Sequence, residues 1–174
     1  MSLTEKRINS QTVYDGKILK LTIDKVSLPD GSESVRECVR HSGGAAVLLV
    51  KDGGVLLVKQ FRYLYGKEIY EIPAGKLEDG EDATAGAARE LEEETGYRAK
   101  LVRMLDLYPS PGYTDEVIHI FLADGYEYIG QRLDEGEFLS YCFIPMDKVL
   151  KMIESGEICD AKTVAAVYKY ISIS

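Results

Sequence analysis

Apolar and polar positions alternate along the N-terminal part of the chain. Between residues 17 and 28, Leu19 and Leu21 are separated by polar side chains, the period of two expected of a strand with one buried face. A Pro-Asp-Gly-Ser turn signal at residues 29–32 precedes a second strand-like segment at 34–41. The pattern therefore predicts an antiparallel strand pair near the N-terminus.

Short strands and helices are predicted along the rest of the chain. A wholly apolar run at residues 45–50 indicates a buried strand. Ala, Leu and Glu dominate residues 82–95, and Gly96 follows them, so a helix that ends at this glycine is expected. Further strands are predicted at 55–60, 68–72, 99–108, 116–123 and 138–144, and further helices at 147–154 and 161–171. This order predicts one α+β domain, in which a mixed sheet packs against helices.

The position of the charged residues changes this picture more than their number. The 174-residue chain has a net charge of −8, which argues against a general nucleic-acid-binding protein, because such proteins present basic surfaces. Eight acids and two bases lie between Lys76 and Glu94, so most of the net charge falls on one helix and the loop before it.

Membrane and secreted classes are not favoured. The longest apolar run has six residues, whereas a membrane-spanning helix needs about 20. Three widely spaced cysteines and the lack of an apolar leader after Met1 predict a cytoplasmic protein with free thiols.

The helix at 82–95 carries a dense carboxylate face. Glu90, Glu93 and Glu94 project from one side, because residues three and four apart are neighbours on a helix. A bound cation would relieve their mutual repulsion, and oxygen ligands without nearby His or Cys favour Mg²⁺, with Mn²⁺ possible. From the charge pattern alone, a solvated acidic surface is an alternative.

The spacing of these residues favours the metal site. The chain follows the order Gly-X5-Glu-X7-Arg-Glu-U-X-Glu-Glu-X-Gly-U, where U is a bulky apolar residue. The fixed positions are Gly75, Glu81, Arg89, Glu90, Glu93, Glu94 and Gly96. This arrangement resembles the Nudix box, with Leu91 and Tyr97 at the U positions. Tyr97 departs mildly from the pattern, since an aliphatic residue is commoner there.

The resemblance implies a Nudix fold, an α/β/α sandwich whose mixed sheet lies between helices and whose box forms a loop–helix–loop. Residues 43–174 would form the Nudix hydrolase domain, and residues 1–42 an N-terminal strand region. Two or three divalent ions would be held by the Glu90, Glu93 and Glu94 carboxylates and by the backbone carbonyl of Ala74.

Arg89 and Glu93 also belong to the implied catalytic machinery. Arg89 can hold a box glutamate, either Glu81 or Glu93, in place through a charge-assisted hydrogen bond.

Segments outside the box resemble the ADP-ribose pyrophosphatase branch of the family. Residues 71–76 precede the box as they often do in that branch, and residues 110–116 resemble its SPG loop. Pro111 stands 15 residues after Gly96, about where these enzymes carry a marker proline. The resemblance implies Mg²⁺-dependent hydrolysis of ADP-ribose, or of a related ADP-sugar, to AMP and ribose 5-phosphate.

This branch also implies a homodimer, in which the N-terminal strands of one subunit help to form the substrate pocket of the other. Carried over by position, Arg36 and Glu37 become candidate substrate contacts made across the dimer. Arg62 would contact the diphosphate or adenosine, since arginine binds phosphate through two hydrogen bonds. Gly112, in the SPG loop, is a further candidate substrate-binding position.

A carboxylate must accept the proton of the attacking water, and in this branch the base often lies on a mobile loop outside the box. Residues 133–138 form an acidic segment with a glycine between two predicted strands. Glu135 is the first candidate for the base and Glu137 the second. A polar turn without catalytic function is the alternative.

Two alternatives to ADP-ribose hydrolysis stay open. The substrate could be another nucleotide sugar, such as ADP-glucose or GDP-mannose. A regulatory domain could instead bind ADP-ribose without cleaving it, although the complete set of box glutamates argues against this. The expected partner is in each case a small molecule, with no nucleic acid or membrane involved.

Overall fold

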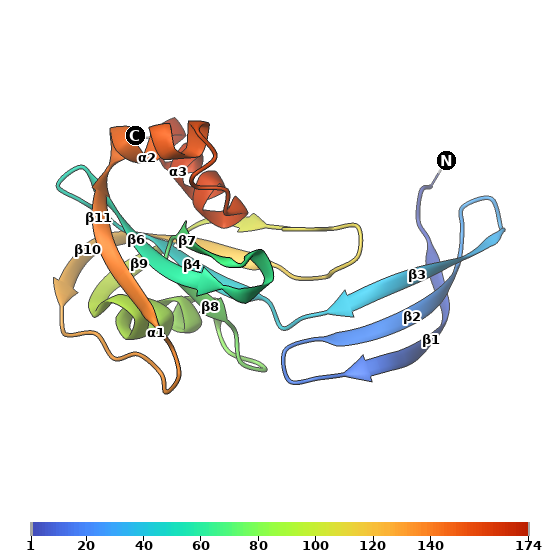
Figure 1. Cartoon of the computed structure of the whole chain (residues 1–174). Coiled ribbons are helices and arrows are strands. Elements are labelled where there is room, and N and C mark those ends of the chain that lie inside the picture. The colour runs from blue at the N-terminus through green and yellow to red at the C-terminus, as the bar shows by residue number, and fades with distance from the viewer. Residues whose placement is uncertain (1, 174) are drawn as a thin grey trace.

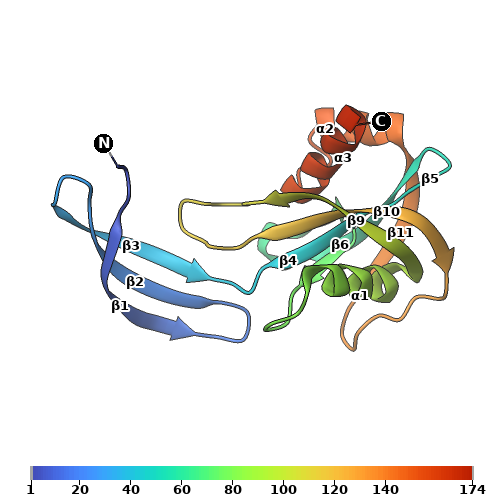
Figure 2. The same ribbon diagram turned by 180° about the vertical axis from the view of Figure 1, so that it is seen from behind.

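The computed structural model describes residues 2–173 and consists of an N-terminal sheet and a larger α+β body (Figure 1). Three antiparallel strands form the N-terminal sheet in the order β1-β2-β3, with bounds β1 (Lys6–Asp15), β2 (Lys20–Ser27) and β3 (Glu33–Arg40). Figures 1 and 2 show this sheet extending away from the body, with the N-terminus at its outer end.

Two sheets form the centre of the body. The first has the order β8-β4-β10-β9, with bounds β4 (Gly44–Leu48), β8 (Ala74–Lys76), β9 (Tyr97–Leu107) and β10 (Ile118–Tyr128). Strands β4 and β10 are parallel and the other pairs are antiparallel. The second has the order β11-β6-β5 with β7 beside β6, and its strands are β5 (Val50–Lys51), β6 (Gly54–Arg62), β7 (Lys67–Glu71) and β11 (Leu139–Pro145). A short 3-10 helix, η1 (Tyr63–Tyr65), joins β6 to β7.

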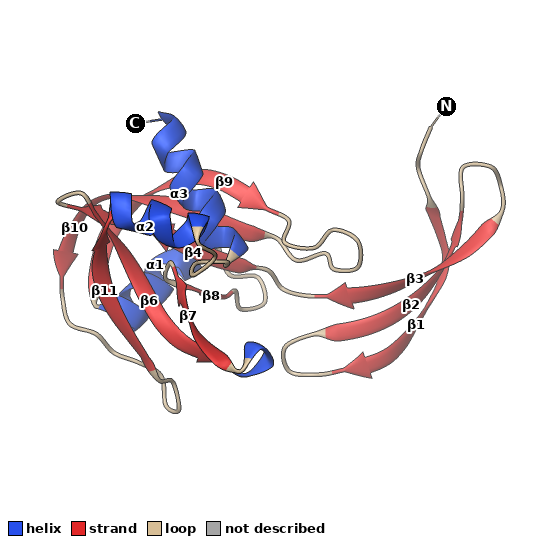
Figure 3. Cartoon of the chain, turned by 45° about the horizontal axis from the view of Figure 1, so that its top comes forward, coloured by secondary structure: helices blue, strands red, loops and turns tan. Residues whose placement is uncertain are grey.

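Helices cover both sides of these sheets. Helix α1 (Ala83–Thr95) lies on one side, and α2 (Met146–Glu154) and α3 (Ala161–Ile173) lie on the other (Figures 1 and 3). The side chain of Asp82 caps α1 by accepting hydrogen bonds from the backbone N–H groups of Thr84 and Ala85, and Gly96 ends the helix at a φ of 74°. The predicted mixed sheet between helices is confirmed.

The apolar run at 45–50 is explained by this layering. Ala46 and Leu48 pack into the core beneath α2 and α3, whereas Ala45 and Val47 pack into the core beneath α1. Because both faces of β4 are covered, every position along the strand is buried, and the sequence shows a continuous apolar run rather than alternation.

The structure adds one strand to the predicted N-terminal pair. Every residue of β1 is exposed, so no apolar period marks this strand in the sequence. Main-chain pairing with β2 holds it in the sheet. Within residues 2–173, no helix is both long and apolar enough to cross a membrane.

Candidate active site

Helix α1 presents its carboxylates to strand β8. Ala87 and Leu91 are fully buried on the sheet side of the helix, and this packing fixes the direction of the acidic face. Glu94 is only 3% exposed, and its Oε2 accepts a hydrogen bond of 2.9 Å from the backbone N–H of Ala74. The carboxylate of Glu90 lies against Gly75, so a side chain at position 75 would require this carboxylate to move.

Arg89 joins the carboxylates of the box. Its Nε lies 3.1 Å from Glu81 Oε1, and its Nη1 lies 2.8 Å from Glu90 Oε1 and 3.0 Å from Glu93 Oε2. The guanidinium thus binds Glu81 and Glu93, the two partners expected from the sequence, and it also binds Glu90. These bonds, with the one to Glu81 the strongest influence, raise the pKa of Arg89.

The carboxylates carry more negative charge than Arg89 balances. Burial raises the pKa of Glu94 to about 8, and the charges of Glu90 and Glu137 add to this effect. Burial also raises the pKa of Glu90, although Arg89 opposes the rise. A divalent cation favours the ionised form of nearby carboxylates, so such an ion would supply the counter-charge that these groups need.

The donor atoms fit a hard divalent cation. Glu90, Glu93, Glu94 and the Ala74–Gly75 backbone offer oxygen only, which suits Mg²⁺ or Mn²⁺. Within residues 2–173, no three Asp, Glu, His or Cys side chains converge on one point as a closed metal cage would require. Mg²⁺ retains several waters and takes only one or two carboxylates at many sites, so an open arrangement is compatible with it.

A cavity of about 210 Å³ lies beside Ala74 and Gly75. Arg62 lines it and binds Glu71 through two hydrogen bonds, Nε to Oε1 at 2.6 Å and Nη2 to Oε2 at 2.8 Å. Lys162 also lines it and contacts Glu71 and Asp160. Two cations therefore face the cavity beside the box, and Glu71 and Asp160 balance part of their charge.

Glu71 and Lys162 were not singled out from the sequence as site residues. Both are buried, at 3% and 8% exposure, and they lie 91 positions apart in the chain. Burial by itself would raise the pKa of Glu71, but hydrogen bonds from Arg62 and the charge of Lys162 outweigh it, so this pKa lies below its ordinary value. The signal in the sequence was the family-like segment at 71–76, to which no residue role was assigned.

A larger cavity of about 720 Å³ adjoins the first one. The two share four lining residues, His41, Glu116, Ile118 and Lys162. Ser110 and Tyr113 of the SPG loop line the larger cavity, whereas Gly112 lies between them at an exposed position. Together the cavities extend from the Ala74–Gly75 backbone to the SPG loop.

The remaining candidates fall in two places. Arg36 is held in the N-terminal sheet by Glu5, with Nη2 to Oε1 at 2.6 Å, and Glu37 is exposed on the next position of β3. Neither residue lines the two cavities within this chain. On the β10–β11 loop (residues 129–138), Glu135 is exposed, whereas Glu137 is half-buried and its charge acts on Glu90 and Glu94.

Comparison with known proteins agrees with this site. Residues 39–167 match the model described as "NUDIX domain", and residues 5–39 match the "Nucleoside diphosphate sugar hydrolase N-terminal domain". The chain is 46% identical to an ADP-ribose pyrophosphatase of Bacillus subtilis (strain 168), covering 95% of this chain and 92% of the relative. It is 42% identical to a methanol dehydrogenase activator of Bacillus methanolicus, covering 94% and 90% of the two chains.

Two further similarities concern substrate class and fold. A GDP-mannose pyrophosphatase of Shigella flexneri serotype 5b (strain 8401) is 36% identical over 153 residues, which cover 80% of this chain and 78% of the relative. A crystal structure of an ADP compounds hydrolase superposes with a TM-score of 0.85 at 22% identity, covering 99% of this chain and 95% of that one. With the box geometry above, these findings show that the chain is an enzyme of the Nudix hydrolase family, similar to its ADP-ribose pyrophosphatase members.

Proposed function

We propose that this enzyme hydrolyses the diphosphate bond of ADP-ribose, or of a closely related ADP-sugar, to AMP and ribose 5-phosphate. One arrangement carries the proposal: the box carboxylates meet the Ala74–Gly75 backbone beside a cavity that Arg62 and Lys162 line. Metal ligands and cationic side chains are both needed to bind a diphosphate. The similarity to an ADP-ribose pyrophosphatase supports the choice of substrate.

The site would hold two or three Mg²⁺ ions, with Mn²⁺ possible, through Glu90, Glu93, Glu94 and the carbonyl of Ala74. When bound, these ions neutralise charge on the diphosphate and lower the pKa of the attacking water. Arg89 holds Glu90 and Glu93 in fixed positions by hydrogen bonds. The protein thereby keeps the ligands arranged before substrate arrives, which reduces the entropy cost of reaching the reactive geometry.

For the general base we propose the reverse of the order expected from the sequence, with Glu137 first and Glu135 second. The charge of Glu137 acts on Glu90 and Glu94, and its side chain is partly shielded from solvent. Glu135 is exposed on the same loop. A base must lie within hydrogen-bonding reach of the water that it deprotonates, and this requirement favours the glutamate that lies nearer to the metal ligands.

Substrate contacts would come from both cavities. Arg62 presents its guanidinium and Lys162 its ammonium at the smaller cavity, next to the place where the diphosphate would lie. The larger cavity adjoins the SPG loop, where Gly112 leaves room for the nucleoside or sugar to approach the backbone. The diphosphate would therefore lie near Lys162, which lines both cavities.

The enzyme would act as a homodimer in which residues 1–42 are the dimerising region and residues 43–174 the catalytic domain. Apolar side chains on the N-terminal sheet are exposed in the single chain, among them Val13, Tyr14 and Val35. A second subunit could cover them and bring Arg36 and Glu37 to its own substrate pocket. A cytoplasmic location is supported by the three free cysteines, Cys38, Cys142 and Cys159, and cell fractionation would test it.

A hydrolysis panel tests the proposed activity directly. Purified enzyme with Mg²⁺ would be given ADP-ribose, ADP-glucose, GDP-mannose, NADH, a diadenosine polyphosphate and 8-oxo-dGTP, and products would be separated by ion-exchange chromatography. We expect the highest kcat/KM with ADP-ribose, AMP and ribose 5-phosphate as products, and no turnover after chelation with EDTA. If ADP-ribose ranked among the poorest substrates, the proposed substrate would be wrong.

The same panel separates the alternatives. Preference for GDP-mannose would fit the 36% identical relative. Binding of ADP-ribose without turnover of any compound would instead indicate a regulatory domain. The buried carboxylate of Glu94, next to the Ala74 backbone, argues against that outcome, because a binding module has no need to bury an unbalanced acidic group.

A further inference from the structure

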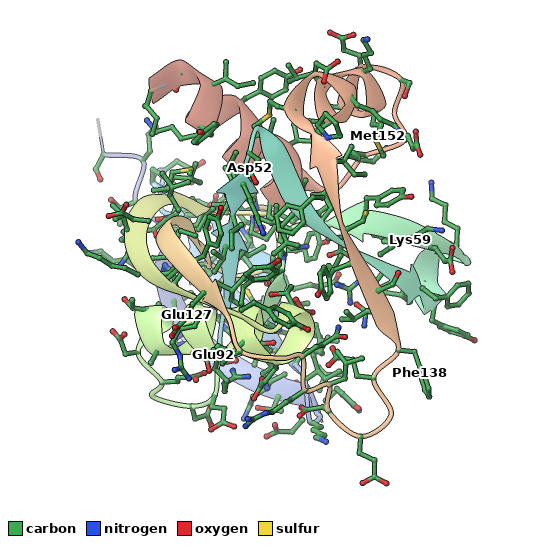
Figure 4. All side chains as sticks on the ribbon, turned by 90° about the vertical axis from the view of Figure 1, so that its left-hand side faces the viewer. Asp52, Lys59, Glu92, Glu127, Phe138 and Met152 are labelled. Atoms are coloured by element: carbon green, nitrogen blue, oxygen red, sulfur yellow. The ribbon has the colours of Figure 1, made fainter. Side chains whose placement is uncertain are left out.

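The β10–β11 loop is attached to the end of the box helix through its first half. Ile129 N–H donates to the carbonyl of Gly96 at 2.8 Å, and Arg132 N–H donates to the carbonyl of Glu93 at 3.1 Å. Figure 4 shows the connection passing the end of α1, between the strand end near Glu127 and Phe138 on the far side. The loop that carries Glu137 is thus bonded to the residues that carry the metal ligands.

The contact between loop and helix is close enough to restrict the sequence. Gly96 has a φ of 74°, and a side chain there would collide with the backbone at Gln131 and Gly130. Tyr97 packs edge to face against Tyr128, with ring centroids 5.3 Å apart. The aromatic residue at the last box position therefore holds the strand end from which the loop departs.

Gln131 supplies the side-chain part of this attachment. Its Nε2 donates a hydrogen bond of 2.6 Å to the backbone carbonyl of Glu94. The last four carbonyls of an α-helix have no partner within the helix, so the amide satisfies one of these groups. Glu94 is at the same time the most buried carboxylate of the proposed metal site, and Gln131 therefore bonds to the backbone of a proposed ligand.

The second half of the loop has fewer constraints. Glu137 N–H donates to the carbonyl of Asp134 at 3.1 Å, which closes a local turn, and Gly136 has a φ of 85°. The position of Glu137 relative to the box carboxylates consequently depends on how firmly residues 129–132 are held. A misplacement of about 1 Å in a reacting group can reduce turnover by about 100-fold.

From these contacts we propose that Gln131 is a positioning residue, which sets the distance between the base on the loop and the metal ligands on α1. The proposal rests on the proposed function, since it requires Glu137 to act as the base. It adds a residue outside the box that lines neither of the two cavities. Its effect passes through the main chain of Glu94 and the loop.

Replacement of Gln131 tests the proposal. In Gln131→Ala the amide is lost, and in Gln131→Glu the shape is kept but the donor is lost. We expect both variants to lower kcat by about 10-fold or more, up to the 100-fold cost of a misplaced group. The KM for ADP-ribose and the Mg²⁺ concentration for half-maximal activity should stay unchanged. Arg132→Ala is the matched control, because it shortens the next side chain but keeps the backbone N–H, and it should retain normal kcat.

A double-mutant cycle separates positioning from a general loss of stability. If Gln131 acts through Glu137, then Gln131→Ala should cause little further loss in a Glu137→Gln background. Additive losses, or a kcat loss that follows a lowered melting temperature, would overturn the proposal. Full activity of Glu137→Gln would also overturn it.

Hydrogen exchange on the metal-free protein supplies a readout that does not depend on turnover. Gln131→Ala should speed exchange of the Ile129 and Arg132 amides while the middle of α1 keeps its protection. Unchanged exchange at these amides would contradict the attachment itself. If wild-type enzyme prefers another nucleotide sugar, the kinetic cycle is run on that substrate, so an error in the proposed substrate is distinguished from an error in the role of Gln131.

Discussion

The N-terminal sheet and the α+β body use charged residues in opposite ways. In the sheet, Arg36 and Glu5 form an ion pair whose side chains are 40% and 37% exposed. In the body, Glu71 and Lys162 form a pair with both partners at 10% or less. Exposed pairs exchange with water at little cost, whereas a buried charge is expensive unless it is paired. Of the four buried charged residues within residues 2–173, Glu71, Glu94 and Lys162 lie where the substrate and metals would bind, and Asp24 lies in the N-terminal sheet, paired with Arg40.

The two regions differ equally in their apolar packing. Within residues 2–40, the buried side chains are Thr22, Asp24 and Val26, which is too few to form a core. The body contains two buried clusters, one on each side of β4. The sheet therefore depends on main-chain pairing and on any surface that covers it, while the body can hold a rigid site by itself. Five predictions test this difference, from the largest expected effect to the smallest.

Glu94→Gln tests whether the buried carboxylate in the body is a metal ligand. We expect kcat to fall by more than about 1,000-fold, because loss of even an outer partner of a metal ligand costs about 10- to 100-fold. The melting temperature without metal should be equal or higher above about pH 8, where the buried Glu94 of the wild type is ionised and Glu90 repels it. Glu92→Gln on the same helix, which faces Arg98, is the control. Near-normal turnover of Glu94→Gln would remove it from the metal site.

Glu71→Gln compares the buried pair of the body with an exposed pair of the sheet. It leaves Arg62 and Lys162 without their shared partner, and breaking a buried pair costs about 3–5 kcal/mol of unfolding free energy. Glu5→Gln, which breaks the exposed pair with Arg36, should have no measurable effect. Urea denaturation at pH 7 would give both values, and equal losses would contradict the comparison.

The contribution of the Glu71–Lys162 pair to the unfolding free energy depends on pH. The pKa of Glu71 in the folded protein lies below its ordinary value of 4.5. Its stabilisation is therefore complete above pH 4.5 and is lost as the pH falls through the folded-state pKa. Wild-type unfolding free energy should fall in that acid range, and Glu71→Gln should show a shallower acid slope.

Glu137→Gln and Glu135→Gln decide which acid on the β10–β11 loop is the base. We expect the first to lower kcat by about 100-fold, the lower end of what general-base catalysis contributes. The second should be nearly silent, because Glu135 is exposed. Single-turnover kinetics at saturating Mg²⁺ would separate the chemical step from product release, and the reverse result would transfer the role to Glu135.

Arg36→Ala tests whether the sheet contributes to the pocket of a second subunit. We expect KM for ADP-ribose to rise by about 10-fold, the value of about 1.4 kcal/mol of lost binding. Arg7→Ala, on the outer strand of the same sheet, is the control. Sedimentation equilibrium of the wild type should show a dimer, and a monomer would remove the reason for a contact in trans.

Mixing two impaired variants in equal amounts gives a sharper form of this test at low substrate concentration. Heterodimers of Arg36→Ala and Glu137→Gln chains would contain one complete site out of two. Since random exchange makes about half of the dimers heterodimers, about one quarter of wild-type activity should return. No recovery would place Arg36 in the site of its own chain or outside any site.

Local patterns in the sequence were sufficient to predict the helices and strands that bury apolar side chains. The helix predicted at 82–95 is α1 at Ala83–Thr95, because Asp82, the Ala-rich face and Gly96 all act within a few residues. Strand β1 was not predicted, since none of its side chains is buried and pairing with β2 is what orders it. Strand β10 continues to Tyr128, beyond the predicted 123, because its exposed half pairs with β9.

The sequence alone determined the family, the box carboxylates and their preference for an oxygen-binding cation, because the spacing of a box on one helix is local information. Only the tertiary structure decided that Glu71 and Lys162 share a buried ion pair beside the cavity, that Glu137 acts on Glu90 and Glu94, and that Gln131 joins the loop to the helix. These contacts join residues that are far apart in the chain. They form because the packing of the sheets brings separate loops to one edge and excludes water between them.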